Sequence, residues 1–133
     1  MSEHYELFYC LEKSIRDLVA ETLESIHGEH WWDQRVPQSI RQNAQANIQR
    51  EVDSGITPRS EGEIDFTTFG ELGEIVRTNW VDFGSMFSSE KAFTKIMTSL
   101  NTLRGPIAHC CPLAEDEIVR LRLSVRDWFR LME

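Results

Sequence analysis

The strongest constraint on the fold is an apolar stripe near the N-terminus whose members recur at steps of three and four residues. The stripe consists of Leu7, Phe8, Leu11, Ile15, Leu18, Val19, Leu23 and Ile26. This spacing places the side chains on one face of an α-helix. His27 and Gly28 follow, and a basic residue in the last turn with glycine beyond it is typical of a helix end. We therefore predict a first helix of about five turns that ends at His27 and buries one face.

Four further segments have the same period. The second helix begins near Pro37, the third opens with the capping-box pair Thr68 and Glu71, and Ser88 or Ser89 caps the fourth. The last covers residues from about 114 to 132. The expected inward residues are Ile40, Ala44 and Ile48 in the second; Phe69, Leu72, Ile75, Val76 and Trp80 in the third; Phe93, Ile96, Met97, Leu100 and Leu103 in the fourth; and Ile118, Leu121, Val125, Trp128, Phe129 and Met132 in the last.

No segment alternates with the period of a strand, and there is no internal repeat. We therefore expect an all-α fold, a bundle of four to five helices. The 133 residues form one domain, 1–133, with a surface loop at about 53–65 that holds two glycines and a proline among charges. Pro106 should interrupt the end of the fourth helix because it lacks a backbone donor. Of the adjacent Trp31 and Trp32, one should enter the core and the other cover a loop.

Charge and composition exclude several classes of protein. The formal net charge is −8, and residues 1–66 carry −7 of it. A protein that binds nucleic acid through overall charge would be basic, so any phosphate contact must be local. No run of 18 apolar residues could span a membrane, and the N-terminus lacks the pattern of a signal peptide. We therefore expect a cytoplasmic protein without a membrane association.

Neither cofactor nor metal is expected from the motifs. The three cysteines, two of them adjacent at 110 and 111, have neither the pattern of a disulfide framework nor that of a zinc site. His27 and His30 could share a metal only if the helix continued through Gly28. None of the common phosphate-loop, dinucleotide, hydrolase or metalloprotease motifs occurs.

One pair of residues does suggest chemistry: Arg104 and His109 stand five residues apart at the end of a predicted buried helix. Arginine pairs with phosphate, and histidine can move a proton near neutral pH. Together they suffice to cleave RNA through its own 2′-hydroxyl without a metal. The same spacing also arises by chance. In that alternative, Arg104 would pair with an acid on a neighbouring helix and His109 would cap the helix end.

The surrounding residues carry a resemblance. Residues 101–109, Asn-Thr-Leu-Arg-Gly-Pro-Ile-Ala-His, are similar to the Arg-x4-His motif of the HEPN superfamily (higher eukaryote and prokaryote nucleotide-binding domains). Upstream, 65–72 and 79–83 resemble the branch that accompanies a eukaryotic mRNA-surveillance endoribonuclease and also occurs in bacterial proteins. Trp31-Trp32 and Pro112-Leu113 fit the same pattern, so the resemblance covers nearly the whole chain.

The resemblance implies a helical bundle that forms a homodimer through the motif-bearing helices. Two motifs would then face one another and build a composite, metal-independent ribonuclease site. Arg104 would bind and polarise the scissile phosphate, and His109 would act as general acid or base. The products would carry a 2′,3′-cyclic phosphate and a 5′-hydroxyl. Such domains serve as toxins, antiphage effectors and RNA-processing enzymes, and an antitoxin or another co-encoded protein would be a further partner.

Two positions depart from the family pattern. The residue after the motif arginine is usually polar, most often Asn, and here it is Gly105. Some toxins of the superfamily have a tyrosine two residues after the histidine, where a partner nucleotidyltransferase modifies them, and here that residue is Cys111. Retention of Arg104 and His109 favours an RNA-cleaving dimer, whereas Gly105 and the acidic N-terminal half favour the alternative, a catalytically inactive HEPN module for dimerisation or partner binding.

Further candidate RNA-binding residues lie on the last helix. Arg122, Arg126 and Arg130 step by four along one face, with Arg120 nearby. Together with Asn101 beside the motif, they are candidates to hold the RNA backbone, or to bind a partner's carboxylates. The alternative is a solvated face whose arginines pair with Asp127 and Glu133.

Overall fold

The computed structural model describes residues 3–55, 62–108 and 113–132, and in this part of the chain it contains helices and no strand. The elements are α1 (Glu3–His27), α2 (Trp31–Arg35), α3 (Gln38–Asp53), the 3-10 helix η1 (Glu63–Phe66), α4 (Phe69–Thr78), α5 (Trp80–Phe83), α6 (Glu90–Ala108) and α7 (Glu115–Leu131). The all-α prediction is confirmed. The five long helices correspond to the five predicted ones, and the three short elements were not expected.

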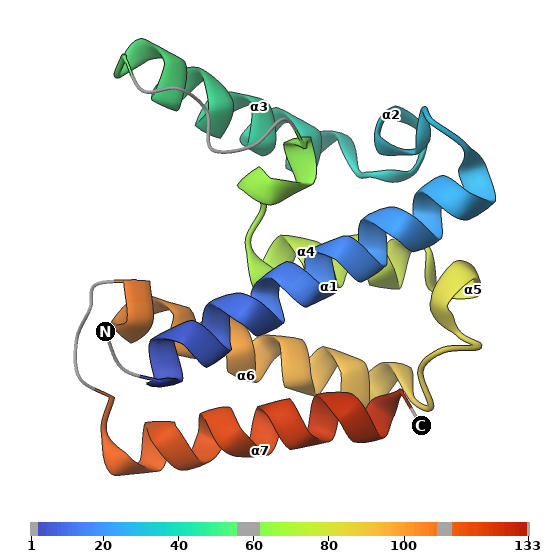
Figure 1. The fold of residues 1–133 in the computed structure, drawn as a ribbon. Coiled ribbons are helices and arrows are strands. Elements are labelled where there is room, and N and C mark those ends of the chain that lie inside the picture. Colours follow the sequence, from blue (N-terminus) through green and yellow to red (C-terminus); the bar gives the residue numbers. More distant parts are fainter. Residues whose placement is uncertain (1–2, 56–61, 109–112, 133) are drawn as a thin grey trace.

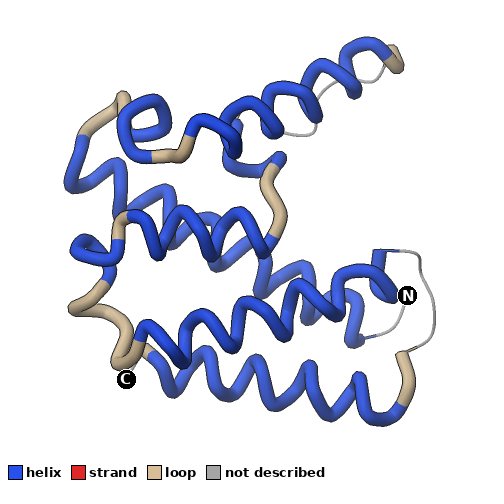
Figure 2. The backbone as a smooth tube through the Cα atoms, turned by 180° about the vertical axis from the view of Figure 1, so that it is seen from behind, coloured by secondary structure: helices blue, strands red, loops and turns tan. Residues whose placement is uncertain are grey.

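Four helices, α1, α4, α6 and α7, build the main body of the bundle. α6 and α7 lie side by side, and α1 crosses the bundle in contact with both α4 and α7 (Figure 1). α4 packs on α6 as well. α3 contacts η1 and extends away from this body, an arrangement that is also visible from behind (Figure 2). α1 also contacts η1, which together with α3 forms an arm beside the main body.

The core follows the apolar stripes. Phe8, Ile15 and Leu23 of α1 are fully buried, as are Phe69 of α4 and Phe93 of α6. Burial of each such side chain contributes about 1.5–3 kcal/mol of transfer free energy. The outer residues of the predicted first stripe, Leu7 and Ile26, are exposed instead (37% and 52%).

The helix ends form as expected. Gly28 has a φ of 87°, which glycine adopts without strain, and its N–H donates to the carbonyl of Glu24 at 2.8 Å. At the start of α4, the Glu71 N–H donates to the Thr68 hydroxyl and the Thr68 N–H donates to the Glu71 carboxylate. This capping box fixes the segment that leads from η1 into α4.

The tryptophan prediction was wrong, because Trp31 and Trp32 are both buried (9% and 8% exposed). Their ring centroids lie 5.7 Å apart at an interplanar angle of 89°. The short helix α2 turns both inward, and the Trp32 side chain hydrogen-bonds to Glu63 of η1. Burial and the nearby Asp33 raise the pKa of Glu63, and the bond from Trp32 opposes this. The pair therefore fixes α2 against the arm.

Three other expectations need correction. The last part of the expected loop at 53–65 is the helix η1, because Ile64 and Phe66 are buried (7% and 4%). Pro106 does not end α6, which continues to Ala108, because the missing donor removes only one helical hydrogen bond. Phe129 and Met132 are not inward but 63% and 38% exposed, since α7 buries only a narrow stripe against its neighbours.

Within the described ranges, no helix is both long and apolar enough for a membrane span.

Candidate functional site

Arg104 stands on the exposed side of α6, opposite the face that enters the core. Leu100, Leu103 and Ile107 of the same helix are at most 2% exposed and fix its rotation. Asn101 and Arg104, three residues apart, are both exposed on the other side. The buried stripe of α6 therefore determines where the motif arginine points.

Arg104 lines a polar pocket of about 320 Å³ to which four parts of the fold contribute. The other lining residues come from α1, from α3, and from η1 with the segment leading into α4. They are Tyr9, Glu12 and Arg16; Asn47, Arg50 and Glu51; and Asp65, Phe66, Thr67 and Thr68. The pocket thus contains three arginines and three carboxylates within a site as large as the smaller ligand pockets of proteins.

A buried ion pair forms one wall of this pocket. Glu12 is only 4% exposed and pairs through Oε1 with Nη2 of Arg16, one turn further along α1. The same Nη2 donates to the backbone carbonyl of Thr67. Glu12 Oε2 and Arg16 Nε are also buried, yet neither has a hydrogen-bond partner in the described part of the chain. Buried polar atoms are normally paired, because an unpaired one costs about 1–3 kcal/mol.

Tyr9 forms part of the rim. Tyr9 is 36% exposed, and its ring lies 4.6 Å from the ring of Tyr5, centroid to centroid. Burial raises the pKa of the Tyr9 phenol, as do Tyr5 and Glu12, while the positive charge of Arg104 acts to lower it. Tyr9 and Arg104 therefore share one electrostatic environment, and Tyr9 keeps its proton at neutral pH.

The opposite wall is held by hydrogen bonds between α3 and η1. Asn47 Nδ2 donates to the carbonyl of Phe66 at 3.1 Å, and Arg50 Nη1 donates to Asn47 Oδ1 at 3.1 Å. These bonds connect the α3 arm to the segment before α4. They also hold the guanidinium of Arg50 beside the pocket.

The sequence matches the family model described as Swt1-like HEPN over residues 6–133. The chain belongs to this family. No curated protein and no solved structure matches it. The HEPN resemblance and the expected fold class are thereby confirmed.

The residues expected in the HEPN site are only partly described. Arg104 lies at the pocket, whereas His109 and Cys111 lie outside the described residues. The Asn101 amide nitrogen approaches Gly70, at 3.5 Å from where a Cβ would stand, so Asn101 lies over the start of α4. At Gly105 a Cβ would meet nothing within 4 Å, and this position therefore faces open space.

Of the residues that line the pocket of this HEPN domain, the sequence predicted only Arg104 as a site residue, and it missed the α1 residues Tyr9, Glu12 and Arg16. A signal was present, because Glu12 and Arg16 stand one turn apart directly beside the buried positions Leu11 and Ile15. Two charged residues next to the apolar stripe of a long helix indicate a buried polar contact. Their partner segment, Thr67, is 51 residues away from Arg16 and could not be inferred.

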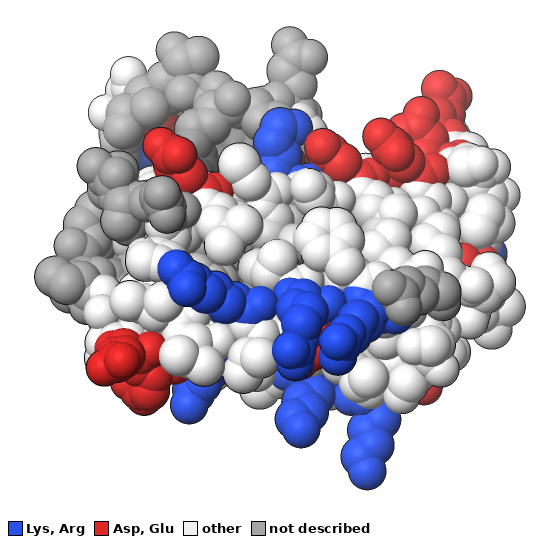
Figure 3. All heavy atoms as spheres, turned by 60° about the horizontal axis from the view of Figure 1, so that its bottom comes forward, with Lys and Arg blue, Asp and Glu red and all other residues white. Residues whose placement is uncertain are grey.

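The arginines of α7 are exposed, as predicted for a surface stripe. Figure 3 shows Lys and Arg side chains gathered across the face that α7 contributes to. Arg126 Nη2 lies 3.7 Å from Asp127 Oδ1, and both side chains are about half exposed. Arg130 and Asp127 line a second pocket of about 300 Å³ between α6 and α7. The proximity of Arg126 to Asp127 agrees with the alternative of a solvated face, in which the arginines pair with acids of the same helix. Arg122 is exposed.

Two of the histidines of this HEPN domain have carboxylate neighbours. His27 lies against Asp82, and the exposed His30 lies 3.5 Å from Glu29. Among the described residues, no group of three or more His, Cys, Asp or Glu side chains could hold a metal ion.

Proposed function

We propose that this HEPN domain is a metal-independent endoribonuclease in which Arg104 and His109 act on the scissile phosphate. One observation carries the proposal: the arginine of an Arg-x4-His motif is exposed beside a polar pocket in a chain of the Swt1-like HEPN family. An arginine pairing only with an acid of a neighbouring helix would be held in an ion pair. Among the described residues no such pair involves Arg104, which favours a role of Arg104 in cleavage over a structural role.

The chemistry needs a base, an acid and a stabilised phosphorane. A histidine takes the proton of the 2′-hydroxyl, whose oxygen attacks the neighbouring phosphorus while the bond from phosphorus to the 5′-oxygen breaks. The leaving 5′-oxygen takes up a proton from a second acid group. Arg104 donates to the equatorial phosphate oxygens, on which negative charge develops. The products are a 2′,3′-cyclic phosphate and a 5′-hydroxyl.

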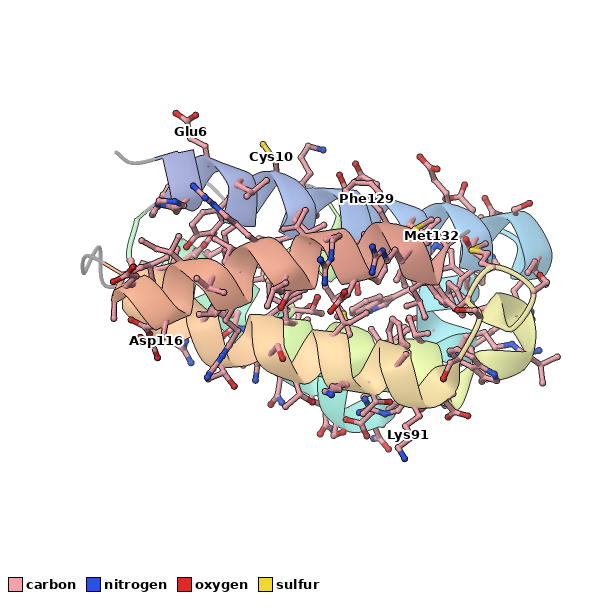
Figure 4. All side chains as sticks on the ribbon, turned by 90° about the horizontal axis from the view of Figure 1, so that it is seen from below. Glu6, Cys10, Lys91, Asp116, Phe129 and Met132 are labelled. Carbon is pink, nitrogen blue, oxygen red and sulfur yellow. The ribbon has the colours of Figure 1, made fainter. Side chains whose placement is uncertain are left out.

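One chain supplies one motif, so the acid and the base are proposed to come from two copies. The exposed face of α7 supports such a homodimer because it holds large apolar side chains next to arginines, a composition typical of interfaces. Phe129 is 63% exposed, Val119 51% and Leu123 41%. Val119 stands near the start of α7, at the end of the bundle where α6 ends, whereas Phe129 and Met132 lie toward the C-terminal end of α7, beside the start of α6 (Figure 4).

The biological role in this proposal is that of a toxin, an antiphage effector or an RNA-processing enzyme in the cytoplasm. A nuclease of this kind needs restraint, so an antitoxin or another co-encoded protein is its proposed partner. The second candidate function is an inactive HEPN module for dimerisation or partner binding. Gly105 favours it, because that position faces open space without the polar side chain usual in the family.

Cleavage of a mixed-sequence RNA in EDTA tests the proposal. The wild type should cut and leave cyclic-phosphate ends, and Arg104→Ala and His109→Ala should each lower the rate by at least about a hundredfold. Arg35→Ala and His30→Ala are matched controls, because both side chains are exposed and stand outside the pocket. If none of the proteins cuts at concentrations where the chain is dimeric, the inactive module is the correct function.

A further inference from the structure

The pocket beside Arg104 contains charged and aromatic side chains that the proposed cleavage reaction does not use. Arg104 is sufficient to bind a phosphate, yet the pocket extends to a buried ion pair on α1, an exposed aromatic ring and a second arginine on α3. A site of about 320 Å³ with these groups can take a planar polar ligand together with a charged group at its edge.

The buried pair Glu12–Arg16 has two hydrogen-bonding atoms without a partner in the described part of the chain. Glu12 Oε2 lacks a donor and Arg16 Nε lacks an acceptor, although both atoms are buried. Nη2 of Arg16 already binds Oε1 and the Thr67 carbonyl, so Oε2 is left to Arg16 Nε or to a ligand. A ligand that offers a donor and an acceptor side by side would satisfy both atoms. The edge of a nucleobase has this arrangement.

Tyr9 supplies the stacking surface for such a base. Its ring is partly exposed at the rim and is braced by Tyr5. Aromatic side chains stack on unpaired bases of single-stranded RNA, and each such contact is worth about 1–3 kcal/mol. Arg104 and Arg50, both exposed at the same pocket, stand where they can bind the phosphates on either side of the base.

Building on the proposed ribonuclease function, we propose that this pocket binds one unpaired base of the RNA strand next to the scissile phosphate, and that Glu12 selects bases with an exocyclic amino group. The amino group of cytosine or adenine donates to Glu12 Oε2, and the adjacent ring nitrogen accepts from Arg16 Nε. Uracil fits poorly, because its single ring N–H lies between two carbonyl oxygens that a carboxylate repels. Glu12 is then a specificity residue rather than a catalytic one.

Binding of fluorescent 2′-O-methyl decamers of A, C or U tests this. These strands cannot be cleaved, because the 2′ nucleophile is blocked, so the readout is independent of activity. The wild type should bind the A and C decamers about tenfold more tightly than the U decamer, as expected for a hydrogen bond to a charged group. Glu12→Gln should reduce this preference to less than about threefold, since an amide also donates to a carbonyl oxygen.

Tyr9→Ala should weaken binding of all three decamers by about fivefold or more, the loss of one stacked base. Glu6→Gln is the matched control on the same helix, because Glu6 is exposed and points away from the bundle (Figure 4). Circular dichroism of each variant checks the fold. If Glu12→Gln does not fold, the wild-type base series and Tyr9→Ala decide.

Equal binding of the three decamers by the wild type, or wild-type binding by folded Tyr9→Ala, would overturn the inference. So would binding of cytidine monophosphate as tight as that of the C decamer, because the pocket would then be a site for free nucleotides. Absence of cleavage together with base-selective binding would reject the nuclease function alone. Cleavage that is insensitive to base identity and to Glu12→Gln would reject the inference alone.

Discussion

The Nε2 atom of His27 lies 2.7 Å from Oδ2 of Asp82, so the last turn of α1 is bonded to α5 across 55 residues of sequence. Both side chains are largely buried (13% and 14% exposed). The bond fixes the C-terminal end of α1, and the position of α1 in turn sets the pocket that holds Tyr9 and Glu12.

We expect His27→Ala to lower the free energy of unfolding by about 1–3 kcal/mol, because it leaves the Asp82 carboxylate buried without its partner. Urea denaturation followed by circular dichroism measures this. His30→Ala removes a histidine whose side chain is 72% exposed and should change the stability by less than about 0.5 kcal/mol. Equal losses in the two variants would show that the contact with Asp82 contributes nothing.

Restoring the usual polar residue after the motif arginine should raise cleavage. A Cβ at Gly105 meets nothing within 4 Å, and Gly105→Asn adds a polar side chain next to Arg104, so the initial rate of RNA cleavage should rise severalfold without loss of stability. Gly105→Ala separates the two effects. It should stabilise α6 by about 0.5–1 kcal/mol through helix propensity and leave the rate unchanged. A gain in rate that is the same for both variants would assign the effect to helix stability.

Val119→Glu should weaken the proposed homodimer. The side chain is 51% exposed in a single chain, so a charge there costs the monomer little, whereas a charge inside an interface costs several kcal/mol. Sedimentation velocity should show a shift to monomer, and cleavage should fall with it. Val81 is 95% exposed on α5 and offers the control Val81→Glu, which should change neither. A dimer that persists in Val119→Glu would place the interface elsewhere.

If the arginines of α7 hold the RNA backbone, Arg122→Ala should change the salt dependence of RNA binding. Each lost phosphate contact lowers the slope of log K against log salt by about 0.7 for a single strand. Titrations at several salt concentrations give this slope. Arg77→Ala, an exposed arginine on α4, should leave it unchanged. An unaltered slope in Arg122→Ala as well would identify the stripe as a solvated face.

Local signals in the sequence predicted much of the fold. The long helix α1 and its end at Gly28 follow from spacing and a single glycine, and the start of α4 follows from Thr68 and Glu71. These features depend on residues a few positions apart. Phe129 was wrongly predicted to face inward. Its spacing fits the helical period, but neighbouring helices cover only a narrow stripe of α7, and Phe129 lies outside that stripe.

The candidate site was predicted only in part, because most of it is formed by contacts between distant segments. Arg104 was found through its motif. The wall opposite it depends on Arg16 reaching the carbonyl of Thr67 and on Asn47 reaching that of Phe66. Neither contact has a local signature, since the partner in each case is a backbone carbonyl that any residue could supply.

The rotation of α6 has a consequence for how this chain can change over generations. Its inner positions, such as Leu103, pack in the core and are required for folding. Arg104 and Gly105 face outward and do not contribute to core packing. Substitutions at the outer positions can therefore switch the proposed cleavage off, or back on, while the core packing persists. Under the proposed function, active and silent descendants of one ancestor can share the same architecture and differ by a single exposed side chain.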